Sequence, residues 1–178
     1  MKLTFKTIAT LSLTSLMTLT AQAHVTIQER TAVQGTYHRA AFKVGHGCEG
    51  SPTVKVVIDL PEGLVGAKPM PKAGWQISTE TRPLAKPYDS HGKAVTERVA
   101  RVTWSGGSLP DAHYDEFVMQ FQVKADAGVL WIPVDQICEK GRNPWMEVPQ
   151  TRTETRGLKF PAARFDVLAP AKSEHKHH

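Results

Sequence analysis

Hydrophobic and polar residues alternate with a period of two through most of the chain after residue 24. β-branched and aromatic side chains fill many of the apolar positions, and segments rich in Gly and Pro separate the alternating runs. These runs predict strands over 25–28, 37–44, 53–60, 75–81, 94–104, 116–123, 130–134 and 145–148. No stretch shows the 3.6-residue period of an amphipathic helix. The pattern predicts an all-β protein, either a small barrel or a single-domain β-sandwich of the immunoglobulin-like or cupredoxin-like kind.

The first 23 residues have a different pattern. Lys2 and Lys6 precede an uncharged stretch over 7–20, and Ala21-Gln22-Ala23 ends the segment. A basic start, an apolar middle and a small-x-small ending are the three parts of a secretory signal peptide. The stretch is too short, and too rich in Thr and Ser, for a membrane-spanning helix of roughly 20 apolar residues. We therefore expect a signal peptide over 1–23, cleavage after Ala23 and export to the bacterial periplasm.

The remaining chain fits one domain over 24–169, followed by a disordered, His-rich tail over 170–178. The formal net charge of the whole chain is +5, and the basic residues are spread along it. No Lys/Arg cluster, Gly-rich phosphate loop or second hydrophobic span follows residue 23. The sequence therefore predicts no nucleic-acid partner and no transmembrane anchor after signal cleavage.

The chain contains two cysteines, Cys48 and Cys138. Their spacing is far from any C-x-x-C redox or zinc pattern. In an oxidising compartment an even, widely separated pair is most simply a disulfide, and a thiolate pair that binds a soft metal is the alternative.

Cleavage after Ala23 would make His24 the first residue of the mature protein. Its free α-amine and the Nδ1 atom of its imidazole could then close one chelate ring around Cu(II). An α-amine has an ordinary pKa of about 7.7–8.0, so it loses its proton readily to a competing metal. Nitrogen donors suit copper, which heads the affinity order of the divalent metals. The alternative is that histidine follows the cleavage site by chance.

A second histidine, His46, lies in the glycine-rich stretch 44–51 that follows a predicted strand. Such a loop exposes side chains and allows close approach of the backbone. His46 could complete a site that His24 leaves open, or it could be an ordinary surface histidine. Glu49 in the same loop could supply an oxygen ligand.

The tryptophans differ in their surroundings. Trp75 and Trp104 stand in alternating strands and are predicted to be core residues. Trp145 follows a turn a few residues after Cys138, so a disulfide would draw it toward the His46 loop. There it could shield a copper ion, or it could be another core aromatic residue.

Other features give weaker signals. The terminal Glu174-His175-Lys176-His177-His178 could bind metal weakly, or it could be a solvated end. His38, His91 and His113 have no partner at a ligand spacing and are interpreted as structural or surface residues. There is no Gly-x-Ser-x-Gly or His-Glu-x-x-His motif, so the sequence predicts no catalytic residues.

Several segments, in the same order along the chain, are similar to one known family. They are AHVT at 23–26, HGCEGSPT at 46–53, LPEG at 60–63, KPMPKAGW at 68–75, VTWSGGSLP at 102–110, DEF at 115–117 and PVDQICEKG at 133–141, followed by Trp145. Together they resemble the YcnI-like family of copper-binding envelope proteins, formerly described only as a domain of unknown function. The resemblance covers nearly the whole mature domain.

The resemblance implies a β-sandwich that binds Cu(II) through the mature N-terminal histidine, in a brace of a single histidine with a tryptophan nearby. The brace histidine corresponds to His24 and the tryptophan to Trp145. Gram-positive members have a carboxylate-bearing stretch where this chain has residues 46–49, so the further ligand stays open between His46, Glu49 and water. Many members continue into a membrane-anchoring helix, and no such helix is expected here.

The leading functional hypothesis is a periplasmic Cu(II)-binding protein, not an enzyme, that acts in copper homeostasis or delivers copper to another envelope protein. A copper-dependent redox enzyme that uses the same brace is the first alternative. A structural envelope domain with incidental metal binding is the second.

Overall fold

A computed structural model describes residues 24–150 and 154–171. The described chain consists of strands joined by turns and loops. In order these are β1 (Thr26–Ile27), β2 (Thr31–Val33), β3 (Tyr37–Val44), β4 (Thr53–Asp59), β5 (Leu64–Pro69), β6 (Gln76–Ser90), β7 (Lys93–Leu109), β8 (Asp115–Val123), β9 (Gly128–Ile132), β10 (Val134–Cys138), β11 (Arg142–Trp145) and β12 (Ala163–Leu168). The predicted signal peptide and most of the predicted tail lie outside the described residues.

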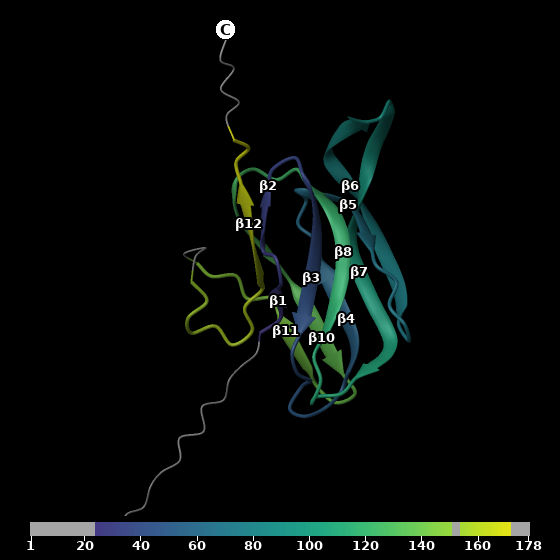
Figure 1. Ribbon diagram of the computed structural model, residues 1–178, viewed down its shortest axis with the longest axis vertical. Coiled ribbons are helices and arrows are strands. Elements are labelled where there is room, and N and C mark those ends of the chain that lie inside the picture. Colours follow the sequence, from purple (N-terminus) through teal and green to yellow (C-terminus); the bar gives the residue numbers. More distant parts are fainter. Residues whose placement is uncertain (1–23, 151–153, 172–178) are drawn as a thin grey trace, which may run out of the picture.

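Two main sheets form the layers of a sandwich (Figure 1). One has the strand order β1-β3-β8-β5 and the other has the order β11-β10-β4-β7-β6. A smaller sheet, β2-β12-β9, joins them at one side, and its β2–β12 pair is parallel. Strands β9 and β10 are consecutive, but they belong to different sheets and are separated only by Pro133. Proline has no N–H for a sheet ladder, so the chain changes sheets at the residue where pairing is interrupted.

The core fills the space between the sheets with the inward residues of each alternating run. Phe42, Ile58, Trp104 and Phe117 are fully buried there. The ring of Phe117 contacts Trp104 at 5.7 Å and the half-buried Trp75 at 4.9 Å between ring centroids. The prediction of an all-β sandwich is confirmed, and so is the prediction that Trp104 is a core residue.

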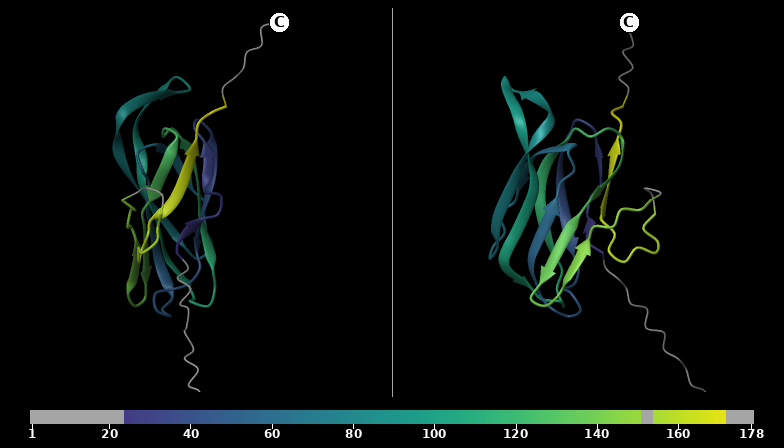
Figure 2. Two further views of the ribbon diagram at one scale, coloured as in Figure 1. Left: turned by 90° about the vertical axis from the view of Figure 1, so that its left-hand side faces the viewer. Right: turned by 180° about the vertical axis from the view of Figure 1, so that it is seen from behind.

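Several predicted breaks in the strand pattern are wrong. The segment 82–93 was expected to be a loop, but β6 and β7 form a long hairpin through it that turns at His91 and Gly92 (Figures 1 and 2). Most residues of β6 are exposed, so the burial of one face did not mark the strand in the sequence. The predicted break after 104 is also wrong, because β7 continues to Leu109.

Other strands were missed or displaced. β2, β5 and β12 lie outside all of the predicted strands. The strand expected over 145–148 is instead β11, which ends at Trp145. β2, β5 and β11 lie at the edges of their sheets, where their partners rather than their own sequences define them. β12 is the central strand of the three-stranded sheet and alternates between buried and half-buried residues, so its sequence carried a strand signal that was overlooked.

In the residues that the structure describes, no helix is long and apolar enough to cross a membrane.

Candidate functional site

The described chain begins at His24, which is held in place by the strand that follows it. In β1, Thr26 pairs with Lys43 and Ile27 with Phe42 of β3. The side chain of Val25 is 2 % exposed and that of Ile27 is 5 % exposed, so both anchor the segment in the core. The same antiparallel register, continued backward, places His24 opposite Gly45, the residue before His46. Strand pairing therefore brings the two candidate histidines to the same end of the sandwich.

Both histidines contact one buried indole. The ring centroid of Trp145 lies 5.6 Å from that of His24 and 6.4 Å from that of His46, and both contacts are edge-to-face with an interplanar angle of 76°. Trp145 is 2 % exposed. It is therefore a core residue that also forms the shared contact surface of the two imidazoles.

Gln136 fixes the orientation of Trp145. The indole N–H of Trp145 donates to Oε1 of Gln136 at 2.9 Å, and the amide nitrogen of Gln136 donates to the carbonyl of His46 at 2.6 Å and to Thr53 Oγ1 at 2.8 Å. The amide of Gln136 is almost completely buried. A buried amide with its donors and acceptor satisfied is a rigid link, so the indole and the His46 loop are positioned as one unit.

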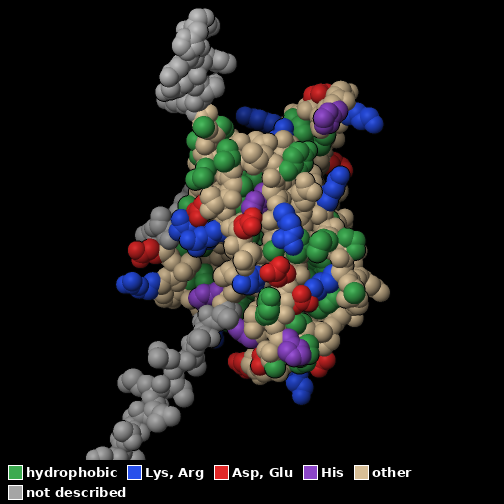
Figure 3. All heavy atoms as spheres, viewed as in Figure 1, with side chains coloured by type: hydrophobic (Ala, Val, Ile, Leu, Met, Phe, Trp, Pro, Cys, Tyr) green, Lys and Arg blue, Asp and Glu red, His purple; other side chains and the backbone are tan. Residues whose placement is uncertain are grey.

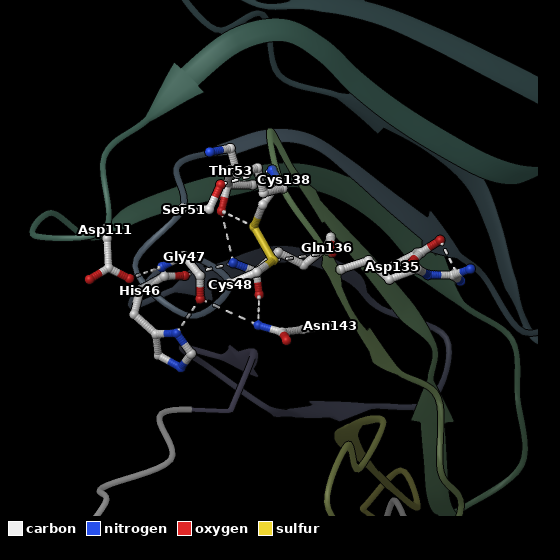
Figure 4. Close-up of a disulfide and its surroundings, with 12 residues drawn as sticks. His46, Gly47, Cys48, Ser51, Thr53, Asp111, Asp135, Gln136, Cys138 and Asn143 are labelled. Carbon is white, nitrogen blue, oxygen red and sulfur yellow. Dashed lines mark hydrogen bonds and ion pairs between the residues drawn. A yellow bond between two sulfur atoms is a disulfide. The ribbon is translucent and has the colours of Figure 1, made fainter.

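The backbone around Gly47 is held from three sides (Figure 4). Its N–H donates to Asp111 Oδ1 at 2.8 Å, and its carbonyl accepts from Asn143 Nδ2 at 3.3 Å. A Cβ atom at Gly47 would lie 1.9 Å from the carbonyl oxygen of Ser51, so only glycine fits at this position. The loop is therefore built to hold one conformation.

The same loop determines which nitrogen of His46 can bind a metal. Nδ1 of His46 lies 2.5 Å from the carbonyl oxygen of Gly47. A carbonyl can only accept, so Nδ1 carries the proton in this contact. In the neutral ring Nε2 then has the free lone pair. A hydrogen bond of this kind, from the non-ligating nitrogen to a backbone carbonyl, is typical of metal-binding histidines.

The disulfide prediction is confirmed. Cys48 and Cys138 are bonded, with Cα atoms 5.9 Å apart, and the bond joins the His46 loop to the end of β10 (Figure 4). Glu49 lies just beyond Cys48, is exposed and has a φ of 50°. Among the described residues, Glu49 makes no hydrogen bond, ion pair or ring contact with His24, His46 or Trp145, whereas the ring of His46 lies against the indole of Trp145.

Two further histidines of the described chain, His38 and His91, make no contact with His24, His46 or Trp145. His38 is 8 % exposed and packs against Phe121 and Phe165, with centroid distances of 5.8 and 5.0 Å. Burial lowers the pKa of His38, and interactions with Glu29 oppose that shift. His91 lies at the tip of the β6–β7 hairpin. Within the described ranges no group of three or more His, Cys, Asp or Glu residues could hold a metal ion.

Sequence reasoning missed the residues that organise the site, above all Gln136, Asn143 and Asp111. Gln136 had a recognisable signal, because it occupies the same face of the alternating β10 strand as Val134 and Cys138. A polar side chain on an inward face needs hydrogen-bond partners. Asn143 and Asp111 gave no such signal, since each lies near a turn where polar residues are common.

The model of the family described as "Domain of unknown function (DUF1775)" matches residues 24–167. An uncharacterised protein from Nocardia farcinica with an immunoglobulin-like fold is similar in structure, with a TM-score of 0.60 and 20% identity over 81% of this chain and 97% of that one. A type I cohesin from Pseudobacteroides cellulosolvens matches with a TM-score of 0.42 and 13% identity over 87% and 97% of the two chains. No curated protein matches the chain.

Proposed function

The chain belongs to the DUF1775 family, the YcnI-like family that its motifs resemble, and from this membership and the geometry above we propose that it binds Cu(II) as cargo at His24. The observation that carries the proposal is that His24 and His46 contact the same buried indole, that of Trp145. Export would make His24 the first residue of the mature protein. Its amine and Nδ1 would then be a chelating pair at the start of a fixed strand.

The residues around His24 offer nitrogen atoms that suit a copper ion. His46 offers Nε2, because its Nδ1 donates to the Gly47 carbonyl. Trp145 offers no ligand atom, since its N–H is directed to Gln136. We assign it the role of excluding water from one side of the ion and keeping the two imidazoles in place. His46, rather than Glu49, is the second ligand in this proposal.

The proposed location is the periplasm. The disulfide between Cys48 and Cys138 supports an oxidising compartment, and the basic, apolar and Ala-x-Ala parts of residues 1–23 support export. In that compartment we propose a role in copper homeostasis or delivery, with an envelope protein as donor or acceptor of the ion.

The test is electron paramagnetic resonance of the Cu(II)-loaded protein purified after export, with its N-terminus checked by mass spectrometry. We expect a spectrum typical of Cu(II) with several nitrogen ligands. It should change when one residue is added before His24, because the α-nitrogen of His24 then lies in a peptide bond and is no longer a free amine. An unchanged spectrum and affinity in the extended protein would contradict the proposal.

The C-terminal histidines require a control. A protein that ends at Pro170 lacks His175, His177 and His178 but keeps β12. The truncated protein should keep the copper spectrum, and the same truncation with His24→Ala should lose it. Loss of the spectrum on truncation alone would place the metal in the tail.

A further inference from the structure

A cavity of about 420 Å³ lies beside His24, and its described lining includes no residue of the disulfide loop. The start of β1, the end of β9 and the chain that leads into β12 enclose it. In Figure 1 the described part of the connection between β11 and β12 forms a lobe next to β1 and β12. The volume is within the range of pockets that hold small organic molecules.

Two hydrogen-bonding atoms at this cavity are buried and lack partners in the described chain. They are Nε1 of Trp131 and Nε2 of His24. Trp131 is 9 % exposed, and an indole nitrogen can only donate. A buried donor without a partner is unfavourable, so the missing group at Trp131 is an acceptor.

The charges at the cavity also favour an acceptor that is negative. Arg30, Arg156 and Arg164 line it, and Glu154 is the acidic residue among the lining side chains. Asp166 pairs with both Arg30, at 3.7 Å, and Arg164, at 2.8 Å. Three guanidinium groups against two carboxylates leave one positive charge in excess. Within the described residues, Arg156 has no ion pair or hydrogen bond.

The rest of the wall is apolar. Val25, Ile27, Pro161 and Ala162 line the cavity together with the ring of Trp131. An inorganic anion would leave this surface without contacts, whereas an organic molecule would cover it. In Figure 3 basic and acidic side chains are interspersed with hydrophobic ones over the visible face, so a basic surface alone does not mark this site.

We infer that this cavity is a binding site for a small organic carboxylate. The carboxylate accepts from the indole N–H of Trp131 and pairs with Arg156, and the apolar part of the ligand lies against Ile27 and Pro161. A guanidinium and a carboxylate form a strong, charge-assisted pair of matching planar shape. These contacts with the carboxylate do not require a bound metal.

One consequence does rest on the proposed copper site. When Nδ1 of His24 holds the ion, Nε2 carries a proton and needs an acceptor, as in other metal-bound histidines. The carboxylate in the cavity supplies that acceptor and orients the ring. The binding experiment is therefore done without copper, so that its failure and the failure of the copper proposal are distinguishable.

The experiment uses the metal-free, exported protein labelled with ¹⁵N, and benzoate as the probe. The indole N–H signal of Trp131 is identified by its loss in Trp131→Phe. We expect benzoate to move this signal in a saturable way, and benzamide, its neutral analogue, to leave it in place. Arg156→Gln should weaken benzoate binding by roughly tenfold, the scale of one hydrogen bond to a charged group. Arg82→Gln, an exposed change of the same kind on β6, should not.

Three results would overturn the inference. They are an indole signal of Trp131 that benzoate does not move, equal effects of benzoate and benzamide, and equal affinities of the Arg156→Gln and Arg82→Gln proteins. Inorganic phosphate is titrated in parallel. A shift with phosphate and none with benzoate would make the cavity an inorganic anion site and would also overturn it. Arg156 is exposed, so its variant tests the inference even where Trp131→Phe lowers stability.

Discussion

Trp145 donates its indole N–H to Gln136 at 2.9 Å, and the amide of Gln136 donates in turn to the carbonyl of His46 at 2.6 Å. One buried side chain thus sets the position of the indole and of the loop that carries the second histidine. The site is held by hydrogen bonds within the protein before any ligand binds.

Replacement of Gln136 by Met should lower the free energy of unfolding by about 2–6 kcal/mol. The change leaves the Trp145 N–H and the His46 carbonyl without partners, and each buried group of this kind costs about 1–3 kcal/mol. Urea denaturation followed by circular dichroism measures the loss. Gln120→Met, at an exposed position on β8, is the matched control and should change stability by less than about 0.5 kcal/mol. Equal effects of the two substitutions would contradict the role assigned to Gln136.

Substitution of His46 and of Glu49, the two residues that could supply the second copper ligand, should affect the Cu(II) affinity differently. We expect His46→Ala to weaken Cu(II) binding by tenfold or more, because it removes the free Nε2 atom near the shared indole. Glu49→Ala should leave binding unchanged, since that side chain is exposed and is separate from the two rings. Competition with a chelator of known affinity measures both. Loss of affinity in Glu49→Ala alone would reverse the assignment.

The disulfide should make a large contribution to stability. Cys48 and Cys138 are 90 residues apart in sequence, and closing such a loop in the unfolded chain corresponds to about 4–5 kcal/mol in the chain-entropy model. The protein with both cysteines replaced by serine should therefore unfold at a lower guanidinium concentration. It should also bind copper more weakly, because the bond anchors the His46 loop. A change below about 1 kcal/mol would mean that the hydrogen bonds hold the loop without it.

The stability of the protein should fall with acid partly through His38. Burial lowers the pKa of His38 in the folded state below its ordinary value of 6.5. The unfolded chain therefore binds a proton first as pH falls. The contribution of neutral His38 is fully present above pH 6.5 and is lost as pH falls from 6.5 toward the lowered pKa.

The melting temperature between pH 7.5 and pH 5 checks this expectation. The decrease should be smaller in His38→Leu than in the unaltered protein. His91→Asn, at the exposed hairpin tip, should keep the full decrease. If His38→Leu shows the same pH dependence as the unaltered protein, the imidazole of His38 does not contribute to it.

The sequence by itself determined the fold class and the identity of the candidate ligands. The alternation over 37–44 and 116–123 predicted two strands, since burial on one face of a strand leaves a period of two in the chain. The pair Cys48 and Cys138 predicted the disulfide. The segment before His24 predicted an exported chain, and that expectation lies outside the described residues.

Only the tertiary structure decided which side chains meet. The pairing of β1 with β3 brings His24 and His46 to the same indole. The pairing of β10 with β4 and β11 places Gln136 between that indole and the His46 loop. These contacts join residues many positions apart, and a local pattern in the sequence reports burial but not the partner. The cavity beside Trp131 was not foreseen for the same reason, because its wall is assembled from three distant segments of the chain.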